Sequence, residues 1–232
     1  MIKLIVFDLD DTLAGLGKGI LPRNIERLHE LEDMGVRIAI CSGKTTDYLC
    51  GVMRQLELRA PVMVGENGAM IRFGVDLPPQ EHVAPYSEAA KRSLRLLREA
   101  FEAAAPGAWY QPNQIGLTPF PHNQAEFDAL QGCIDALKPQ LEDVVIYKHC
   151  DCYDITPDGI TKKSGLERLG RLLGIAPEET VAVGNGVNDY PMFEYAGLSV
   201  GVNVPQPERV NRNFATPDEA LEFLLGMKES ES

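Results

Sequence analysis

Short apolar runs alternate with helical stripes along the first 65 residues, and their order predicts a parallel sheet. Residues 2–8 (IKLIVFD) are almost all apolar, which is typical of a strand buried on both faces. Residues 36–41 and 61–64 form two further apolar runs, and the segments between them, 22–34 and 45–57, read as helices. Strands and helices in strict alternation predict a doubly wound α/β sheet with right-handed crossovers.

The pattern changes near residue 80 and returns near residue 156. Between these points we expect helices at 86–104 and 123–138 and short strands at 107–111, 114–118, 143–148 and 151–155. Beyond them we expect helices at 161–174 and 188–195, strands at 180–183 and 198–202, and a last helix from Pro217 to about Met227 behind a capping box at Thr216. The sequence therefore predicts a Rossmann-like core of residues 1–80 and 156–232, with a small α+β domain of residues 81–155 inserted in it.

Composition excludes several classes of protein. Among the 232 residues 44% are hydrophobic and 24% charged, as in a soluble globular chain and unlike a disordered one. A net charge of −12 argues against a nucleic-acid partner, although a local site can still bind a phosphorylated small molecule. We expect no membrane span, because no run of 18 apolar residues exists. Five cysteines in no disulfide framework are typical of the reducing cytoplasm, and the oligomeric state stays open.

Two carboxylates follow the first predicted strand directly. Asp8 and Asp10 are two positions apart in an extended segment, so their side chains point the same way. Two neighbouring carboxylates repel each other unless a cation lies between them. Mg²⁺, which binds oxygen ligands, would relieve that repulsion. The alternative interpretation is an ordinary acidic turn.

Three more polar segments fall at the same predicted edge of the sheet. Ser42 and Gly43 follow the second strand, where a hydroxyl and backbone N–H groups can cradle an anion. Lys162 opens a core helix, where it can pair with a phosphate or with a buried carboxylate. The glycine-rich loop 184–189 follows another strand and carries oxygen ligands. Each segment alone is also compatible with plain turn or helix-start chemistry, but ligands bind at this edge of doubly wound sheets.

Taken in order, these segments resemble the haloacid dehalogenase superfamily. The matching motifs are DLDDT at 8–12, Ser42 in CSG, Lys162 in GITKKSGLERL and GNGVND at 184–189. The position of the insert, together with GENGAMI at 65–71, resembles the phosphoglycolate and sucrose phosphatase-like branch, which carries an α/β cap. The resemblance implies a Mg²⁺-dependent phosphatase that hydrolyses a small phosphorylated metabolite, a phosphoglycolate-like acid or a sugar phosphate. The inserted domain would then set substrate specificity.

The resemblance also implies a role for each site residue. Asp8 would be the nucleophile that forms an aspartyl-phosphate, and Asp10 the general acid and base. Ser42 would hold a phosphoryl oxygen, and Lys162 rather than Lys163 would offset the shared negative charge. Contacts with substrate or phosphate are expected from Thr12, Gly43, Asn67 and Asn188, and Mg²⁺ ligands from Asp8, Asp10, Asn185 and Asp189. Asn185 departs from the family, which usually has an acidic residue there, so we expect weaker metal binding.

Two alternatives to hydrolysis stay open. Related mutases share this architecture, so the chain could transfer phosphate between sugar hydroxyls. It could instead be a catalytically impaired protein that binds a phosphorylated ligand, an alternative that only Asn185 favours.

Three features of the insert can be interpreted as either purely structural or functional. The basic stripe Lys91, Arg92, Arg95 and Arg98 is interpreted as a solvated helix face balanced by Glu88, Glu99 and Glu102. His149–Cys152 is interpreted as a strand and its turn rather than a zinc site, because it lacks paired ligand spacing. The segment 109–114 could equally contact a leaving group or bury Trp109 in the core of the insert.

Overall fold

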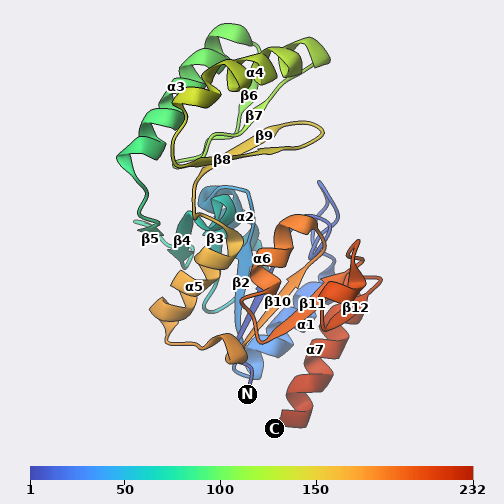
Figure 1. Ribbon diagram of the computed structural model, residues 1–232. Coiled ribbons are helices and arrows are strands. Elements are labelled where there is room, and N and C mark those ends of the chain that lie inside the picture. The colour runs from blue at the N-terminus through green and yellow to red at the C-terminus, as the bar shows by residue number, and fades with distance from the viewer. Residues whose placement is uncertain (232) are drawn as a thin grey trace. The chain divides into compact units, whose positions relative to one another are not determined.

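The computed structural model describes residues 1–231 and divides into two compact units (Figure 1). The core unit comprises residues 1–83 and 161–232, and the inserted unit comprises residues 84–160. Each unit has hydrophobic clusters of its own.

One eight-stranded sheet organises the core unit. Its strands are β1 (Leu4–Phe7), β2 (Arg37–Cys41), β3 (Val62–Gly65), β4 (Met70–Phe73), β5 (Gln80–Val83), β10 (Thr180–Gly184), β11 (Leu198–Val202) and β12 (Arg212–Phe214). They lie in the order β12-β11-β10-β1-β2-β3-β4-β5, and only the β3–β4 and β4–β5 pairs are antiparallel. The predicted doubly wound α/β core is therefore confirmed.

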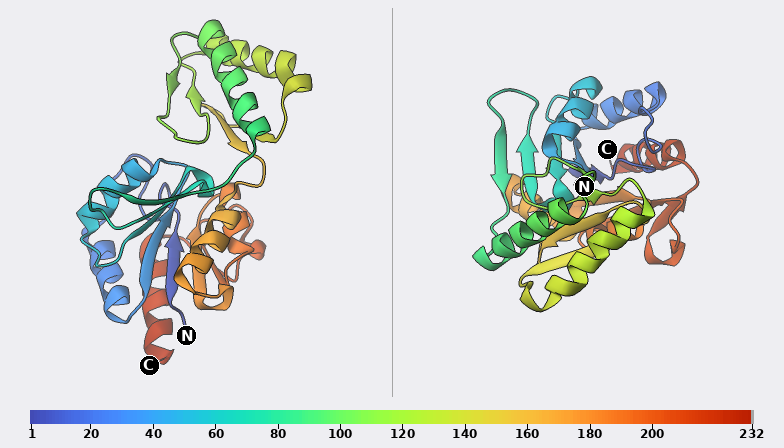
Figure 2. Two further views of the ribbon diagram at one scale, coloured as in Figure 1. Left: turned by 90° about the vertical axis from the view of Figure 1, so that its left-hand side faces the viewer. Right: turned by 90° about the horizontal axis from the view of Figure 1, so that it is seen from above.

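Helices cover both faces of this sheet (Figure 2). One face packs against α1 (Pro22–Asp33), α2 (Thr46–Leu56) and α7 (Pro217–Glu231), and the other against α5 (Lys162–Leu173) and α6 (Tyr190–Phe193). Along β1, Ile5 and Phe7 enter the first cluster while Leu4 and Val6 enter the second. Because both faces are buried, the strand needs apolar residues at every position.

Strand register brings the polar loops to one edge. Phe7 in β1 lies opposite Ile40 in β2 and Val183 in β10. The next residue continues the ladder, since the Asp8 N–H donates to the Val183 carbonyl at 2.8 Å. The carboxyl ends of these parallel strands therefore meet, and the segments that follow them share one edge.

A turn after β3 locks the start of α5 against this edge. It is the 3₁₀ turn Glu66–Gly68, whose φ angles of +51°, +54° and +104° all lie in the left-handed region. Such a run is costly for non-glycine residues and persists only where the surroundings enforce it. The Asn67 N–H donates to the Ser42 carbonyl at 3.0 Å, and a Cβ at Gly68 would lie 2.2 Å from the Thr161 oxygen. Only glycine fits there.

The inserted unit has two helices, which pack against two small hairpins. Its elements are α3 (Glu88–Ala104), α4 (Gln124–Leu137), β6 (Trp109–Tyr110), β7 (Pro119–Phe120), β8 (Val144–Lys148) and β9 (Tyr153–Pro157). The pairs β6–β7 and β8–β9 are antiparallel, and a bridge from Leu117 to Ile155 joins them. Leu97 and Phe101 of α3 pack with Leu130 of α4 in its core. Further 3₁₀ turns in the chain span Lys138–Gln140, Pro177–Glu179, Val187–Asp189 and Pro207–Arg209.

Several predicted elements differ from the observed ones. The strand expected at 107–111 is reduced to the two residues of β6, and the strand expected at 114–118 is wrong, because the partner of β6 is β7 at Pro119–Phe120. The segment between them is held by side-chain hydrogen bonds from Gln111 to Asn113 and from Asn113 to Thr118. The helix expected at 188–195 becomes a 3₁₀ turn and the short α6. β4, β5 and β12 were not predicted, and β5 is a largely exposed, polar edge strand that shows no apolar alternation.

The final helix has the predicted start but a later end. The capping box is confirmed, since Thr216 Oγ1 accepts the Glu219 N–H and Glu219 Oε2 accepts the Thr216 N–H, both at 3.3 Å. The helix continues to Glu231, beyond the predicted end near Met227.

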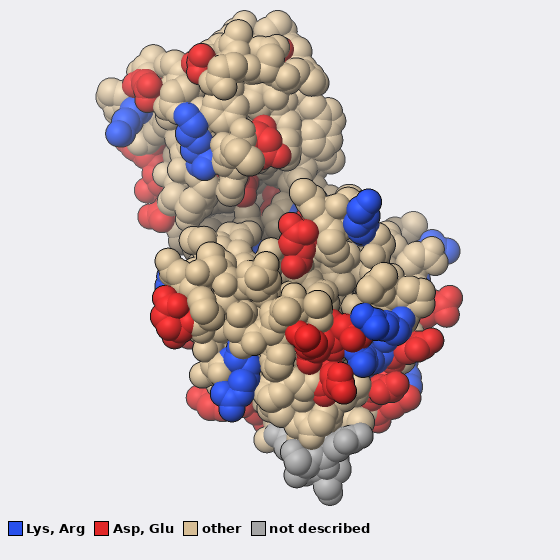
Figure 3. All heavy atoms as spheres, turned by 90° about the vertical axis from the view of Figure 1, so that its right-hand side faces the viewer, with Lys and Arg blue, Asp and Glu red and all other residues tan. Residues whose placement is uncertain are grey.

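The surface and the cysteines agree with the composition. Acidic side chains are spread over the face shown in Figure 3, as the net charge of −12 requires. All five cysteines are free thiols. Among residues 1–231, no helix has the length and apolar character that a bilayer crossing requires.

Candidate active site

Asp8 is the buried carboxylate at the centre of the predicted site. It follows β1 directly and only 6% of it is exposed. Its Oδ1 accepts a hydrogen bond from Lys162 Nζ at 2.7 Å, and its Oδ2 accepts one from Thr12 Oγ1 at 3.1 Å. The structure therefore brings together three residues that the motifs predicted for one site.

Lys162 reaches Asp8 from the first turn of α5. The helix begins behind Thr161, whose side chain accepts the Ser164 N–H, so the backbone at its first residue is fixed. Lys162 is 2% exposed and also donates to Asp189 Oδ1 at 2.6 Å. Lys163 points elsewhere, toward Glu194 at 3.5 Å, and its side chain is 41% exposed. The geometry thus favours Lys162 over its neighbour.

One cation between two carboxylates leaves this buried cluster with a net charge of −1. Burial raises the pKa of Asp8, and the ammonium of Lys162 opposes that rise. Burial would lower the pKa of Lys162, but the carboxylates of Asp8 and Asp189 outweigh it and hold the pKa above the usual range. Burial also raises the pKa of the nearby Cys41 thiol to about 12, so it adds no charge. The cluster therefore favours a further cation.

Asp189 fixes the backbone of the 184–189 loop through hydrogen bonds. Its Oδ2 accepts the N–H groups of Asn185 at 2.8 Å and Gly186 at 2.9 Å, while Oδ1 faces Lys162. Asp189 has no exposed surface, and a Cβ at Gly184 would lie 2.6 Å from its carboxyl carbon. Both of its oxygens accept hydrogen bonds within the protein, so a metal contact by Asp189 would share an oxygen with one of these partners.

The oxygen atoms around Thr12 are of the kind that Mg²⁺ binds as ligands. The Thr12 hydroxyl lies 3.1 Å from both Asp8 Oδ2 and Asn185 Oδ1, and its single proton can serve only one of them at a time. Within residues 1–231 no group of three or more His, Cys, Asp or Glu side chains is arranged to hold a metal. Mg²⁺ nevertheless binds through one or two carboxylates together with water and substrate phosphate. Asp8 and Asn185 supply such a donor set.

Asp10 lies at the exposed rim of the site rather than in the buried cluster. Its Oδ2 is 3.2 Å from Lys44 Nζ, and both side chains are about one-third exposed or less. Ser42 is buried, and its Oγ accepts the Lys44 N–H at 3.3 Å. Sequence reasoning missed Lys44, although it follows Ser42 and Gly43 in the same loop, and that position was the available signal.

The predicted substrate contacts are only partly brought together. The side chain of Asn67 packs on Gly43, since a Cβ there would lie 3.4 Å from its amide atoms. Asn188 is exposed on the turn before α6. No described hydrogen bond joins Asn188 to the cluster of Asp8, Thr12 and Lys162.

Solved structures share this fold across nearly the whole chain. A haloacid dehalogenase-like hydrolase from Bacteroides thetaiotaomicron superposes with a TM-score of 0.80 at 19% identity, covering 97% of this chain and all of the other (100%). A sugar phosphatase of haloacid dehalogenase subclass IIB gives a TM-score of 0.70 at 19% identity, with 96% and 98% covered. At these identities the likeness establishes the fold alone.

Curated relatives extend over similar lengths. A phosphoglycolate phosphatase from Methanoculleus marisnigri is 27% identical over 212 residues, covering 88% of this chain and 86% of the relative. A 5-amino-6-(5-phospho-D-ribitylamino)uracil phosphatase from Bacillus subtilis is 24% identical over 253 aligned positions, covering 86% and 87%. The model of the haloacid dehalogenase-like hydrolase family matches residues 5–114 and 111–212. That match takes in the Asp8 loop, Ser42, Lys162 and the 184–189 loop, so this chain belongs to the haloacid dehalogenase-like hydrolases.

Proposed function

We propose that this protein is a Mg²⁺-dependent phosphatase that hydrolyses a small phosphorylated metabolite through an aspartyl-phosphate. The observation that carries this proposal is the environment of Asp8. Its carboxylate is buried, accepts a hydrogen bond from Lys162 at 2.7 Å, and lies 3.1 Å from the Thr12 hydroxyl, which is also 3.1 Å from Asn185 Oδ1. Burial removes water from this carboxylate and raises its pKa, and the adjacent ammonium of Lys162 opposes that rise and so favours the ionised form that a nucleophile requires.

In the first step Asp8 attacks phosphorus in line. A bond forms between a carboxylate oxygen of Asp8 and phosphorus, and the bond from phosphorus to the ester oxygen breaks. Asp10 gives its proton to the departing oxygen, so the alcohol leaves neutral. Lys162 remains beside Asp8 and offsets the charge of the phosphoryl group, and the Ser42 hydroxyl holds one phosphoryl oxygen.

In the second step water hydrolyses the aspartyl-phosphate. Asp10, now ionised, takes a proton from the water as its oxygen attacks phosphorus. The bond between phosphorus and Asp8 breaks, which releases inorganic phosphate and restores the carboxylate. Bound Mg²⁺, held by the Asp8 carboxylate, the Asp10 backbone carbonyl and Asn185, would neutralise negative charge on the transferring group.

Two observations support a small phosphate ester as the substrate: the substrates of the relatives and an exposed aromatic residue in the insert. The relatives named above act on phosphoglycolate and on a phosphorylated ribityl compound, and both are small phosphate esters. We assign the inserted unit the role of a specificity cap. Its segment 109–114 carries Trp109, which is 54% exposed and paired with Phe120 at 5.4 Å between ring centres. An exposed aromatic ring such as that of Trp109 is suited to contact with a ligand.

The test is phosphate release from a panel of phosphate esters with Mg²⁺ or with EDTA. The panel should include 2-phosphoglycolate, several sugar phosphates and p-nitrophenyl phosphate. Rapid quenching with ³²P-labelled substrate should trap a labelled protein in wild type and none in Asp8→Asn. Phosphate appearing on a second sugar without release would indicate a phosphotransferase. Binding with no turnover of any ester would indicate a phospho-ligand binding protein, and either result would overturn the proposal.

A further inference from the structure

Basic residues of the inserted unit are concentrated on one helix. Residues 84–160 contain eleven Asp and Glu but only six Lys and Arg. Four of those six cations lie on α3, namely Lys91, Arg92, Arg95 and Arg98. A unit with a net negative charge thus carries a local positive surface. The helix-face interpretation of this stripe requires that each cation has a carboxylate nearby.

Three of the four cations have such a partner. Lys91 Nζ lies 2.6 Å from Glu88, the guanidinium of Arg92 lies 3.7 Å from Glu142, and that of Arg98 lies 3.8 Å from Glu102. A solvated helix face is sufficient to explain these three residues, because surface ion pairs of this kind are common.

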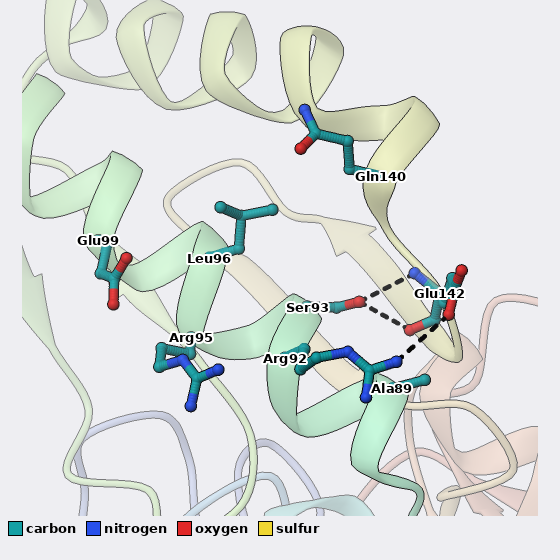
Figure 4. Close-up of a pocket in the computed structure, with 8 residues that line it drawn as sticks. All are labelled: Ala89, Arg92, Ser93, Arg95, Leu96, Glu99, Gln140 and Glu142. Carbon is teal, nitrogen blue, oxygen red and sulfur yellow. Dashed lines mark hydrogen bonds and ion pairs between the residues drawn. The ribbon is translucent and has the colours of Figure 1, made fainter.

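Arg95 is the exception. Within residues 1–231 it makes no hydrogen bond and no ion pair, even to Glu99 one turn along α3. Figure 4 shows the contrast, since Arg92 reaches Glu142 while no contact is drawn from the guanidinium of Arg95.

Arg95 lines a cavity that contains cations and no carboxylate. This cavity of about 250 Å³ lies between α3 and the loop 113–117. Lys91, Arg95 and Arg98 all line it, with Tyr86 and the amide side chains of Asn113 and Gln114. Two of the cations are held in place by rings: Lys91 lies 5.2 Å from the ring centre of Tyr86, and Arg98 lies 5.5 Å from that of Tyr110. Glu88 and Glu102, the partners of these two cations, are not among the lining residues.

The adjacent cavity provides a contrast. It has a volume of about 360 Å³ and is the one drawn in Figure 4. Arg92 and Arg95 line it together with Glu99 and Glu142, so its cations and carboxylates balance. Arg92 lines only this second cavity, whereas Lys91 and Arg98 line only the first. The positive charge is therefore specific to the cavity beside the loop 113–117.

We propose that this cavity is an anion site that takes a carboxylate or phosphate group of a small metabolite. An unpaired guanidinium binds such a group with two parallel hydrogen bonds, and the ammonium and second guanidinium add charge. The volume suits an anionic group with a few carbon atoms. The anion is either part of the substrate or a separate effector. The first of these sources rests on the phosphatase function proposed above, whereas the second does not.

The first experiment measures binding without turnover. Malonate, a dicarboxylate that lacks phosphorus, is titrated into ¹⁵N-labelled wild type, Arg95→Gln and Arg92→Gln, and the amide shifts of residues 114–117 are followed. Arg92→Gln is the matched control, because it removes an exposed arginine from the same helix but not from this cavity. We expect saturable shifts in wild type and in the control, and binding at least tenfold weaker in Arg95→Gln. Absence of saturation, or equal binding by both variants, overturns the proposal.

The second experiment identifies the source of the anion. KM is measured for 2-phosphoglycolate, which has a carboxylate beyond its phosphate, and for p-nitrophenyl phosphate, which has none. If Arg95→Gln raises KM at least fivefold for the first only, the anion belongs to the substrate. If it changes neither KM while malonate binding is lost, the ligand is a separate anion. A wild type that hydrolyses neither ester overturns the phosphatase proposal, and the malonate titration still decides the anion site.

Discussion

Lys162 Nζ lies 2.6 Å from Asp189 Oδ1 and 2.7 Å from Asp8 Oδ1, so one buried lysine joins two loops that are far apart in the sequence. All three residues are almost wholly buried. A buried ion pair is costly to desolvate and is retained where its geometry matters, which agrees with a role in placing Asp8.

Replacement of Lys162 should unfold or strongly destabilise the protein as well as inactivate it. In Lys162→Met the carboxylates of Asp8 and Asp189 remain buried without a cation, and breaking such a pair costs about 3–5 kcal/mol. The matched control is Lys163→Met, because the Lys163 side chain is partly exposed and its ion pair is with Glu194 at 3.5 Å, outside the buried cluster. The control should change the free energy of unfolding by about 0.5 kcal/mol or less. Urea unfolding of both variants measures the free energy of unfolding. Equal losses in the two variants would mean that Lys162 does not stabilise the protein through the buried carboxylates.

Asp8→Asn should abolish turnover while the protein stays folded. The amide cannot act as the nucleophile, and loss of a nucleophile costs far more than about 100-fold in rate. Its shape is unchanged, and Asp189 remains as a partner for Lys162. Activity and circular dichroism are measured together. A folded variant with more than about one-hundredth of the wild-type rate would place the chemistry elsewhere.

The same variant should alter how stability depends on pH in metal-free protein. Burial raises the pKa of Asp8 above its ordinary value of 3.8. The folded state then binds the proton of the Asp8 carboxyl group more tightly than the unfolded state does. Protonation of Asp8 therefore stabilises the folded protein at low pH, and this stabilisation is lost as pH rises through the raised pKa. Asp8→Asn has no titrating group at this position, so its stability does not fall for this reason as pH rises. In EDTA, the melting temperature of Asp8→Asn minus that of wild type should therefore increase from about pH 4 upward. A difference that falls with pH would contradict the direction assigned to Asp8.

The Mg²⁺ requirement should respond to residue 185. Asn185→Asp places a charged oxygen where the amide oxygen lies 3.1 Å from Thr12 Oγ1, and we expect tighter Mg²⁺ binding by about 1–3 kcal/mol. Asp189→Ala should lower metal affinity and rate together, because the N–H groups of Asn185 and Gly186 lose their acceptor. A Mg²⁺ titration of activity in the three proteins checks both. An unchanged midpoint in Asn185→Asp, or a harmless Asp189→Ala, would remove this loop from the metal site.

Trp109 should influence which ester is cleaved without altering the chemistry. Trp109 is more than half exposed, so Trp109→Ala should fold. Contacts with the leaving group change kcat/KM for one ester relative to another, whereas a small aryl phosphate makes few of them. We expect kcat/KM to change for phosphoglycolate or sugar phosphates and to stay within about twofold for p-nitrophenyl phosphate. Equal losses on every ester would indicate a folding defect or a catalytic role for the insert.

Sequence periodicity was sufficient for most of the core and insufficient for the edges. β1, β2 and β10 are buried on both faces, so their runs of apolar residues identify them without tertiary information. β4 and β5 contain Arg72, Gln80 and Glu81, and they form strands because a neighbouring strand is present to pair with them. In the insert, the strand predicted at 114–118 is absent and its place is taken by a segment with side-chain hydrogen bonds among Gln111, Asn113 and Thr118, which no pattern in the sequence reports.

The sequence by itself determined which residues could carry the chemistry. Asp8 and Ser42 follow buried strands and Lys162 opens a helix, and the spacing of these positions places their backbones at one edge of a parallel sheet. Only the tertiary structure decided what each side chain contacts. It placed Asp189 beside Lys162, brought Lys44 to Asp10, and gave Asn188 an exposed position with no described hydrogen bond to the cluster. Backbone position follows from local patterns, whereas side-chain partners depend on residues more than a hundred positions away, such as Lys162 for Asp8.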